Sequence, residues 1–125
     1  MVNFSDLRAK REEGFTLVEM MVVVLVVGIL VAIAIPAVLN QKKAAVDSEV
    51  KSDLKSAVMA VERWFVSHPN GIPTQAVISN IKKDKETTLT LTGIGDGEYI
   101  IKGTNPKGNT SAGTGFEYNS LTDTL

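Results

Sequence analysis

Few side chains in this sequence could do acid–base chemistry, and the single histidine, His68, is the first of them. It lies in the stretch Ser67-His68-Pro69-Asn70-Gly71, whose composition is typical of the turn that ends a helix. A Ser-His-Asp arrangement would have to use His68 as its base. We therefore predict that His68 is a solvated turn residue and that the chain is not an enzyme.

Metal and cofactor chemistry has little support in the sequence. Asp96 and Glu98 flank a glycine-rich turn as calcium ligands could, but their spacing is not that of an EF-hand, so we predict a solvated hairpin turn. The chain has no cysteine, which excludes a disulfide or a thiolate metal site. We predict no metal and no cofactor.

Charge gives equally little support for nucleic-acid binding. The net charge is -1 and the isoelectric point is near 5.8, so the chain lacks a strong basic field. Lys82, Lys83 and Lys85 form the one basic cluster in the second half of the chain, and no aromatic side chains interleave with them. We expect a solvated face there, with DNA contact as a weakly supported alternative.

Glu19 is the one carboxylate whose position is unusual. It stands where an unbroken apolar run begins, at Met20, and a carboxylate at mid-bilayer costs about 2.5 to 3.5 kcal/mol on insertion scales. One interpretation places Glu19 at headgroup depth, solvated and without a role. The other is that the side chain is drawn into an apolar environment and requires a partner.

The apolar run that follows Glu19 predicts a membrane-spanning helix. From Met20 to Leu39 no charged or strongly polar side chain occurs, and about twenty helical residues match the ~30 Å hydrocarbon core of a bilayer. A lone strand in lipid would leave its backbone groups unpaired, so a helix is favoured despite the many valines and isoleucines. Gly28 and Pro36 should make this helix soft or kinked.

Beyond Asn40 the apolar residues recur at steps of three and four, which predicts an amphipathic helix over residues 40–68. The apolar stripe consists of Val46, Val50, Leu54, Ala57, Val58, Val61, Trp64 and Phe65. The opposite face carries Lys43, Asp47, Lys51, Lys55, Glu62 and Arg63.

The remainder of the chain is predicted to form short strands. Thr87 to Thr92 and Glu98 to Lys102 should form a hairpin across a turn at Gly93 to Gly97, and Gly115 to Asn119 should be a third strand after a loop from Gly103 to Gly113. Residues 74–81 stay open between a helical turn and a strand. The predicted fold is α+β, a long N-terminal helix packed on a small antiparallel sheet of about three strands.

The run Gly14-Phe15-Thr16-Leu17-Val18-Glu19, followed by the apolar helix, resembles the processing site of type IV pilins and the related pseudopilins. The resemblance implies that a membrane peptidase cuts between Gly14 and Phe15, that Phe15 is then N-methylated, and that the helix packs into a filament. It is specific from Gly14 to about Leu39 and only architectural beyond.

For Glu19 the resemblance implies a role in assembly. Cutting before Phe15 creates an amine whose reference pKa of about 7.7 to 8.0 leaves it mostly cationic at neutral pH, and methylation keeps this charge. Phe15 and Glu19 are four residues apart, so they can share a helix face within one subunit. In the family, the amine is thought to meet Glu19 of a neighbouring subunit and to set the register.

The same resemblance covers two further residues and has two departures. Gly28 and Pro36 fall where pilins commonly carry a glycine and a proline, which implies that the helix loosens between them on assembly. Glu12 and Glu13 stand before Gly14, where many family leaders are basic. The absence of cysteine removes the disulfide that bounds the C-terminal loop of many pilins, so another device must hold the last strand.

The predicted organisation is a cleaved leader at 1–14, a transmembrane and filament-core helix at 15–39, an amphipathic helix at 40–68, and a sheet head at 69–125. We expect a pilin that forms a homopolymer, with a prepilin peptidase, membrane assembly machinery and lipid as its partners. The precursor should lie in the cytoplasmic membrane with its leader in the cytoplasm, and the assembled pilus should be extracellular.

Several alternatives stay open at this point. The filament could serve adhesion, motility, DNA uptake or, as a pseudopilus, type II secretion, and the chain could be a major or a minor subunit. A different class would be an exported or membrane-anchored small binding module. For export, Ala32-Ile33-Ala34 offers a signal-peptidase site, and the mature chain would then start at Ile35.

Overall fold

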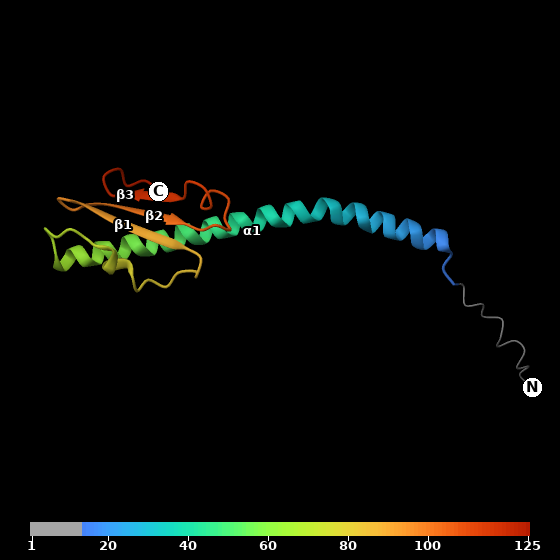
Figure 1. Cartoon of the computed structure of the whole chain (residues 1–125), viewed down its shortest axis with the longest axis horizontal. Coiled ribbons are helices and arrows are strands. Elements are labelled where there is room, and N and C mark those ends of the chain that lie inside the picture. The colour runs from blue at the N-terminus through green and yellow to red at the C-terminus, as the bar shows by residue number, and fades with distance from the viewer. Residues whose placement is uncertain (1–13) are drawn as a thin grey trace, which may run out of the picture. The chain divides into compact units, whose positions relative to one another are not determined.

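The computed structural model describes residues 14–125, so the predicted leader lies outside the described residues except for Gly14. The dominant element is helix α1, Leu17–Ser67, whose 51 residues run through Gly28 and Pro36 without a break in helical assignment. The chain divides into two compact units, one ending at Ala37 and the other beginning at Val38. Helix α1 contributes to both (Figure 1).

In the first unit, the apolar side chains of α1 are exposed at every described position. Within residues 14–125, α1 is the one helix that is long and apolar enough to cross a membrane by length and composition. A helix satisfies its own backbone hydrogen bonds, which explains why this valine-rich segment can be helical although no described residue buries its side chains. The predicted apolar helix is therefore present.

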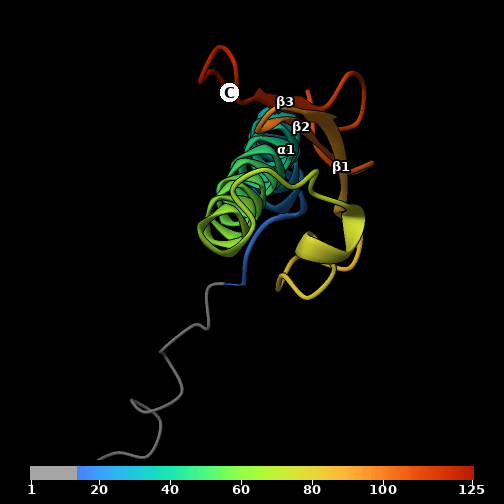
Figure 2. The same ribbon diagram turned by 90° about the vertical axis from the view of Figure 1, so that its left-hand side faces the viewer.

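In the second unit, three antiparallel strands form one sheet in the order β1, β2, β3. The strands are β1, Thr88–Gly95; β2, Glu98–Thr104; and β3, Phe116–Asn119. Seen along α1, the sheet lies on one side of the helix (Figure 2). The predicted α+β class and the three strands are confirmed.

The core of the second unit lies between α1 and the sheet, as the apolar stripe predicts. Val50, Leu54, Ala57 and Val61 are fully buried on the helix. They meet strand residues whose side chains point to the same face, since positions in a strand alternate in direction. These partners are Leu89, Leu91, Tyr99 and Ile101.

The hairpin turn is shorter than predicted. Gly93 to Gly95 belong to β1, and only Asp96 and Gly97 connect it to β2, with φ angles of 52° and 82°. Two central residues with positive φ suit the twist of a two-residue hairpin, which is why the strands continue up to this pair. The glycine-rich composition correctly marked the turn but overstated its length.

Gly103 was predicted to begin a loop but lies inside β2. A Cβ atom there would come within 2.9 Å of Val50 Cγ1 and 3.3 Å of Leu89 Cδ2. Glycine at this position therefore lets α1 approach the sheet closely, a role that composition alone does not distinguish from a loop.

The segment left open in the sequence, residues 74–81, contains the 3₁₀ helix η2, Gln75–Ile78. Its first residue covers the edge of the sheet: Gln75 Nε2 donates to the carbonyl oxygen of Leu89, and the amide of Leu91 donates to Gln75 Oε1, both at 2.8 Å. One side-chain amide thus takes the place of a neighbouring strand beside β1. An open edge would otherwise present unpaired backbone groups.

Candidate processing and assembly site

The predicted cut lies in an exposed segment before the helix. Gly14, Phe15 and Thr16 precede α1, and the side chain of Phe15 is 79% exposed. A Cβ atom placed on Gly14 would meet no described atom within 4 Å. Nothing in the described part of the fold therefore requires glycine at this position.

Thr16 and Glu19 form a reciprocal cap at the start of α1. The amide of Thr16 donates to Glu19 Oε2 at 2.8 Å, and the amide of Glu19 donates to Thr16 Oγ1 at 3.2 Å. This is a capping box, which satisfies two of the amide groups that a helix start leaves without intrahelical partners. The Thr-x-x-Glu spacing could have predicted it, but our sequence interpretation did not use it.

The cap changes the expected relation between Phe15 and Glu19. Since helix α1 begins at Leu17, Phe15 lies before the helix, and the helix face that the two residues were expected to share within one subunit is not formed. Glu19 is nevertheless exposed, and it is the only charged residue between Gly14 and Leu39. Its carboxylate is held by its own chain while remaining open to a second partner.

Of the two predicted helix breakers, neither interrupts α1. Gly28 has open space where a Cβ would stand, and Pro36 lies inside the helix. Loosening of the helix between them during assembly stays a prediction.

Asp47, predicted as one more charge on the solvated face, holds the loop between β2 and β3. Its Oδ1 accepts hydrogen bonds from the amides of Asn109 and Ser111 at 3.0 Å and from Ser111 Oγ at 2.7 Å, and its Oδ2 accepts one from the amide of Thr110 at 2.9 Å. Desolvation alone would raise the pKa of Asp47, but these hydrogen bonds outweigh it and lower the pKa to about 2.

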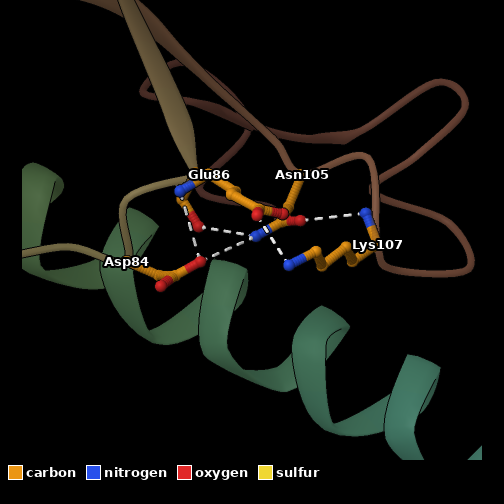
Figure 3. A network of polar contacts seen from close by, with 5 residues as sticks. Asp84, Glu86, Asn105 and Lys107 are labelled. Atoms are coloured by element: carbon orange, nitrogen blue, oxygen red, sulfur yellow. Dashed lines mark hydrogen bonds and ion pairs between the residues drawn. The ribbon is translucent and has the colours of Figure 1, made fainter.

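Asn105 is the second anchor of this loop. It is buried, and its Nδ2 donates to Thr87 Oγ1 at 3.1 Å and to Asp84 Oδ2 at 3.4 Å, while its Oδ1 accepts from the amide of Lys107 at 3.0 Å. The ammonium of Lys107 pairs with Glu86 at 2.6 Å (Figure 3). Together with Asp47, this network holds the loop before the last strand, the task that the absent disulfide left open.

Glu62, also predicted as a solvated charge, accepts a hydrogen bond of 2.5 Å from the hydroxyl of Tyr99. Burial raises the pKa of Tyr99, and the bond to Glu62 raises it further. The phenol therefore stays protonated and fixes strand β2 to the helix.

The other residues that the sequence raised as possible catalytic, nucleic-acid or metal contacts have local roles in the fold of the second unit. His68 is exposed and stacks on Trp64 at 4.5 Å between ring centroids, with Nδ1 3.0 Å from Ser67 Oγ. Lys83 donates to the carbonyl oxygen of Thr87. Within residues 14–125, no three His, Cys, Asp or Glu side chains are grouped as a metal site would need, and Asp96 occupies the hairpin turn.

Comparison with known proteins finds one sequence motif and several relatives. Residues 9–35 match the prokaryotic N-terminal methylation motif. The chain is 44% identical over 55 residues to the type IV major pilin protein PilA of Myxococcus xanthus, and 34% identical over 58 residues to the type II secretion system core protein G of Pseudomonas aeruginosa. It is 31% identical over 72 residues to the type IV wide pilus major component PilA4 of Thermus thermophilus.

These alignments cover 44%, 46% and 58% of this chain. They span 25%, 41% and 55% of the respective relatives, so a large part of each relative has no counterpart in the alignment. The chain is thus similar to type IV pilins and to core protein G of type II secretion systems, and its residues 9–35 carry the N-terminal methylation motif.

Proposed function

We propose that the chain is a structural subunit that is cut between Gly14 and Phe15, N-methylated at Phe15, and polymerised into an extracellular type IV pilus. The observation that carries this proposal is the first unit of α1. Its apolar side chains are exposed throughout, and the methylation motif stands directly before them. Such a surface is stable in lipid, and it is equally suited to a filament core built from copies of itself.

Gly14 fits the role of a cleavage residue. Since no described neighbour restricts the size of its side chain, the requirement for glycine would come from the peptidase that binds the segment. Replacement by a bulky residue should leave the fold unchanged and cause uncut precursor to accumulate in the membrane.

Glu19 would have two partners in succession. Before assembly its carboxylate accepts from the amide of Thr16, which supports its presence at the apolar boundary. Removal of the leader keeps that amide and adds the cationic amine of Phe15. In a filament, the amine of a neighbouring subunit could then approach the same carboxylate, and a buried carboxylate without such a partner would be costly.

The test is assembly in the native host with variants that separate charge from capping. Glu19→Gln keeps an oxygen that can accept from Thr16 but removes the charge, whereas Thr16→Val removes the capping hydroxyl and keeps the charge. We expect Glu19→Gln, like Glu19→Ala, to be cleaved normally while filament yield falls at least tenfold. Thr16→Val should assemble with a smaller loss, and Glu49→Gln, an exposed carboxylate of the second unit, is the control. Normal filaments from Glu19→Gln would refute the assembly role.

A pseudopilin of a type II secretion system is the second candidate, because the similarity extends to core protein G of Pseudomonas aeruginosa and of Aeromonas hydrophila. Deletion of the gene separates the two: loss of surface pili supports the pilus reading, and loss of protein secretion with pili intact supports the pseudopilus. An abundant pilus subunit should also be the bulk component of purified filaments.

The proposed precursor spans the cytoplasmic membrane once with its leader inside, where the peptidase and the assembly machinery act. Intact-mass measurement of the mature chain tests the processing step. A mature chain that begins at methylated Phe15 supports this step. A chain that begins at Ile35 would indicate export by a general signal peptidase and would contradict the proposed pilin processing.

A further inference from the structure

A groove runs between α1 and the loop that joins β2 to β3, entirely within the second unit. Its volume is about 740 Å³. Lys42 and Lys43 line it from the helix, and Lys107 lines it from the loop, together with the apolar side chains of Leu39 and Val46. None of the residues that line it is acidic.

The loop that forms one wall of the groove is held in place by hydrogen bonds. Asp47 accepts the amides of Asn109, Thr110 and Ser111, so this wall is fastened to the helix one turn beyond Lys43. The buried Asn105 fixes the amide of Lys107 from the other end of the loop. The sequence alone does not bring Lys107 near Lys42 and Lys43; these contacts do.

The charged side chains that line the groove are all cationic, and the carboxylate of Asp47 behind the loop wall is occupied by loop hydrogen bonds. Lys107 is partly neutralised by Glu86, but within residues 14–125 neither Lys42 nor Lys43 belongs to an ion pair, and both are exposed. A negatively charged group that enters between them would therefore meet two cations and displace no internal partner.

The groove also begins where the apolar run ends. Leu39 is the last residue of that run. Because a helix rises ~1.5 Å per residue, Lys42 and Lys43 lie about 5 Å beyond Leu39 along the helix axis. A bilayer of 40–45 Å with a ~30 Å hydrocarbon core leaves about 5 to 8 Å for each headgroup layer. If the run spans the membrane, the lysines therefore lie at the depth of the lipid phosphates.

We propose that this groove binds the headgroup of an anionic phospholipid while the subunit is in the membrane. Lys42 and Lys43 would contact the phosphate, and Leu39 and Val46 would pack against the adjoining apolar part of the lipid. The bound lipid keeps the second unit close to the membrane surface, and it must be released when the subunit enters a filament. This inference rests on the proposed membrane-resident precursor.

The test uses the full chain reconstituted in vesicles of phosphatidylcholine alone or of phosphatidylcholine mixed with phosphatidylglycerol. Lipids that stay bound after gentle detergent extraction are counted by native mass spectrometry. Native protein should retain phosphatidylglycerol in preference to phosphatidylcholine. Lys42→Gln with Lys43→Gln should reduce this preference by about fivefold per lysine. The matched control is Lys82→Gln with Lys85→Gln, two exposed lysines outside the groove, and it should change nothing.

Two outcomes would overturn the proposal. The first is an unchanged preference for phosphatidylglycerol in the Lys42/Lys43 double variant whose Trp64 fluorescence shows a folded second unit. The second is an unchanged lipid preference combined with weaker filament assembly, which would assign the groove to an acidic surface of a second copy. Failure to insert into phosphatidylcholine alone would instead refute the membrane-resident precursor, so the two proposals fail separately.

Discussion

Helix α1 carries apolar side chains along both of its halves, but within residues 14–125 only those of the second half are buried. Leu30, in the first unit, is 61% exposed, whereas Leu54, in the second, is fully buried beneath the sheet. The same residue type in the same helix thus belongs to a buried core at one position and lies exposed at the other. The apolar surface of the first unit therefore requires an apolar environment that the described chain does not supply, whereas the second unit buries its own apolar stripe.

The largest expected effect tests this contrast directly. Leu54→Ala should destabilise the second unit by about 2 to 5 kcal/mol, since it removes buried methyl groups and leaves a cavity. Leu30→Ala should change the stability of that unit by less than about 0.5 kcal/mol. Urea unfolding of the full chain in micelles can be followed by Trp64, the single tryptophan, which lies in the second unit. Equal effects of the two substitutions would break the comparison.

The next effect concerns Asp47, whose carboxylate joins the loop between β2 and β3 to helix α1. Asp47→Ala should cost about 2 kcal/mol, because it leaves three loop amides without their charged acceptor. Hydrogen exchange should rise at Asn109, Thr110 and Ser111 and stay unchanged in β1. Glu49→Ala, which removes an exposed carboxylate two residues further along the helix, is the control. Protection of the loop amides that survives Asp47→Ala would show that Asn105 alone holds the loop.

The hydrogen bonds of Asp47 also predict that the stability of the second unit depends on pH. The pKa of Asp47 is lowered to about 2 in the folded unit, below the ~3.9 of an unfolded chain, so the unfolded chain binds the proton more readily. The stabilisation by Asp47 is therefore complete above about pH 4 and is lost as the pH falls toward about 2. In Asp47→Asn this part of the acid transition should disappear. An identical acid transition in the variant would contradict the lowered pKa.

A smaller effect is expected at the edge of the sheet. Gln75→Ala removes two hydrogen bonds to the backbone of β1 and should cost about 1 to 2 kcal/mol. It should also expose the strand edge and increase self-association of the subunit, measured by light scattering. Asn80→Ala, at an exposed position shortly after η2, is the control. Unchanged association would show that the rest of the segment before β1 is enough to cover the edge.

Periodicity and length were sufficient to predict the parts of the fold that repeat. The stripe from Val50 to Val61 follows from helical spacing, and the apolar run follows from its length, because each is a property of neighbouring residues. The candidate cut site at Gly14 and Phe15 was likewise readable as a local motif. Its helix cap at Thr16 was equally local and was missed only because the Thr-x-x-Glu spacing was not applied.

The head contacts could not be predicted in the same way. Asp47 and Glu62 fall on the polar face of the helix and look like solvated charges, yet their partners lie far along the chain in Ser111 and Tyr99. Such contacts depend on how a loop folds back onto the helix, and no local spacing encodes that path. Gly103 shows the same limit, because its role depends on how closely Val50 approaches.

The smallest expected effect has the opposite sign and comes from a second aspartate of α1. Asp53 is buried on the side of α1 that faces the core, and within residues 14–125 its Oδ2 has no hydrogen-bond partner. Burial raises the pKa of Asp53, so the folded unit binds its proton more tightly than the unfolded chain, and stability falls as the pH rises above about 3.9.

Asp53→Asn should therefore stabilise the second unit at neutral pH, by about 1 kcal/mol at most, because it removes a charge that burial disfavours. Asp47→Asn, six residues earlier on the same helix, should destabilise it under the same conditions, since that carboxylate is fully engaged. Unfolding of both variants at neutral pH, followed by Trp64 fluorescence, measures the two signs side by side. A loss of stability in Asp53→Asn would mean that the charged carboxylate of Asp53 stabilises the second unit. Burial on this half of the helix would then not be enough to predict whether a charged side chain lowers stability.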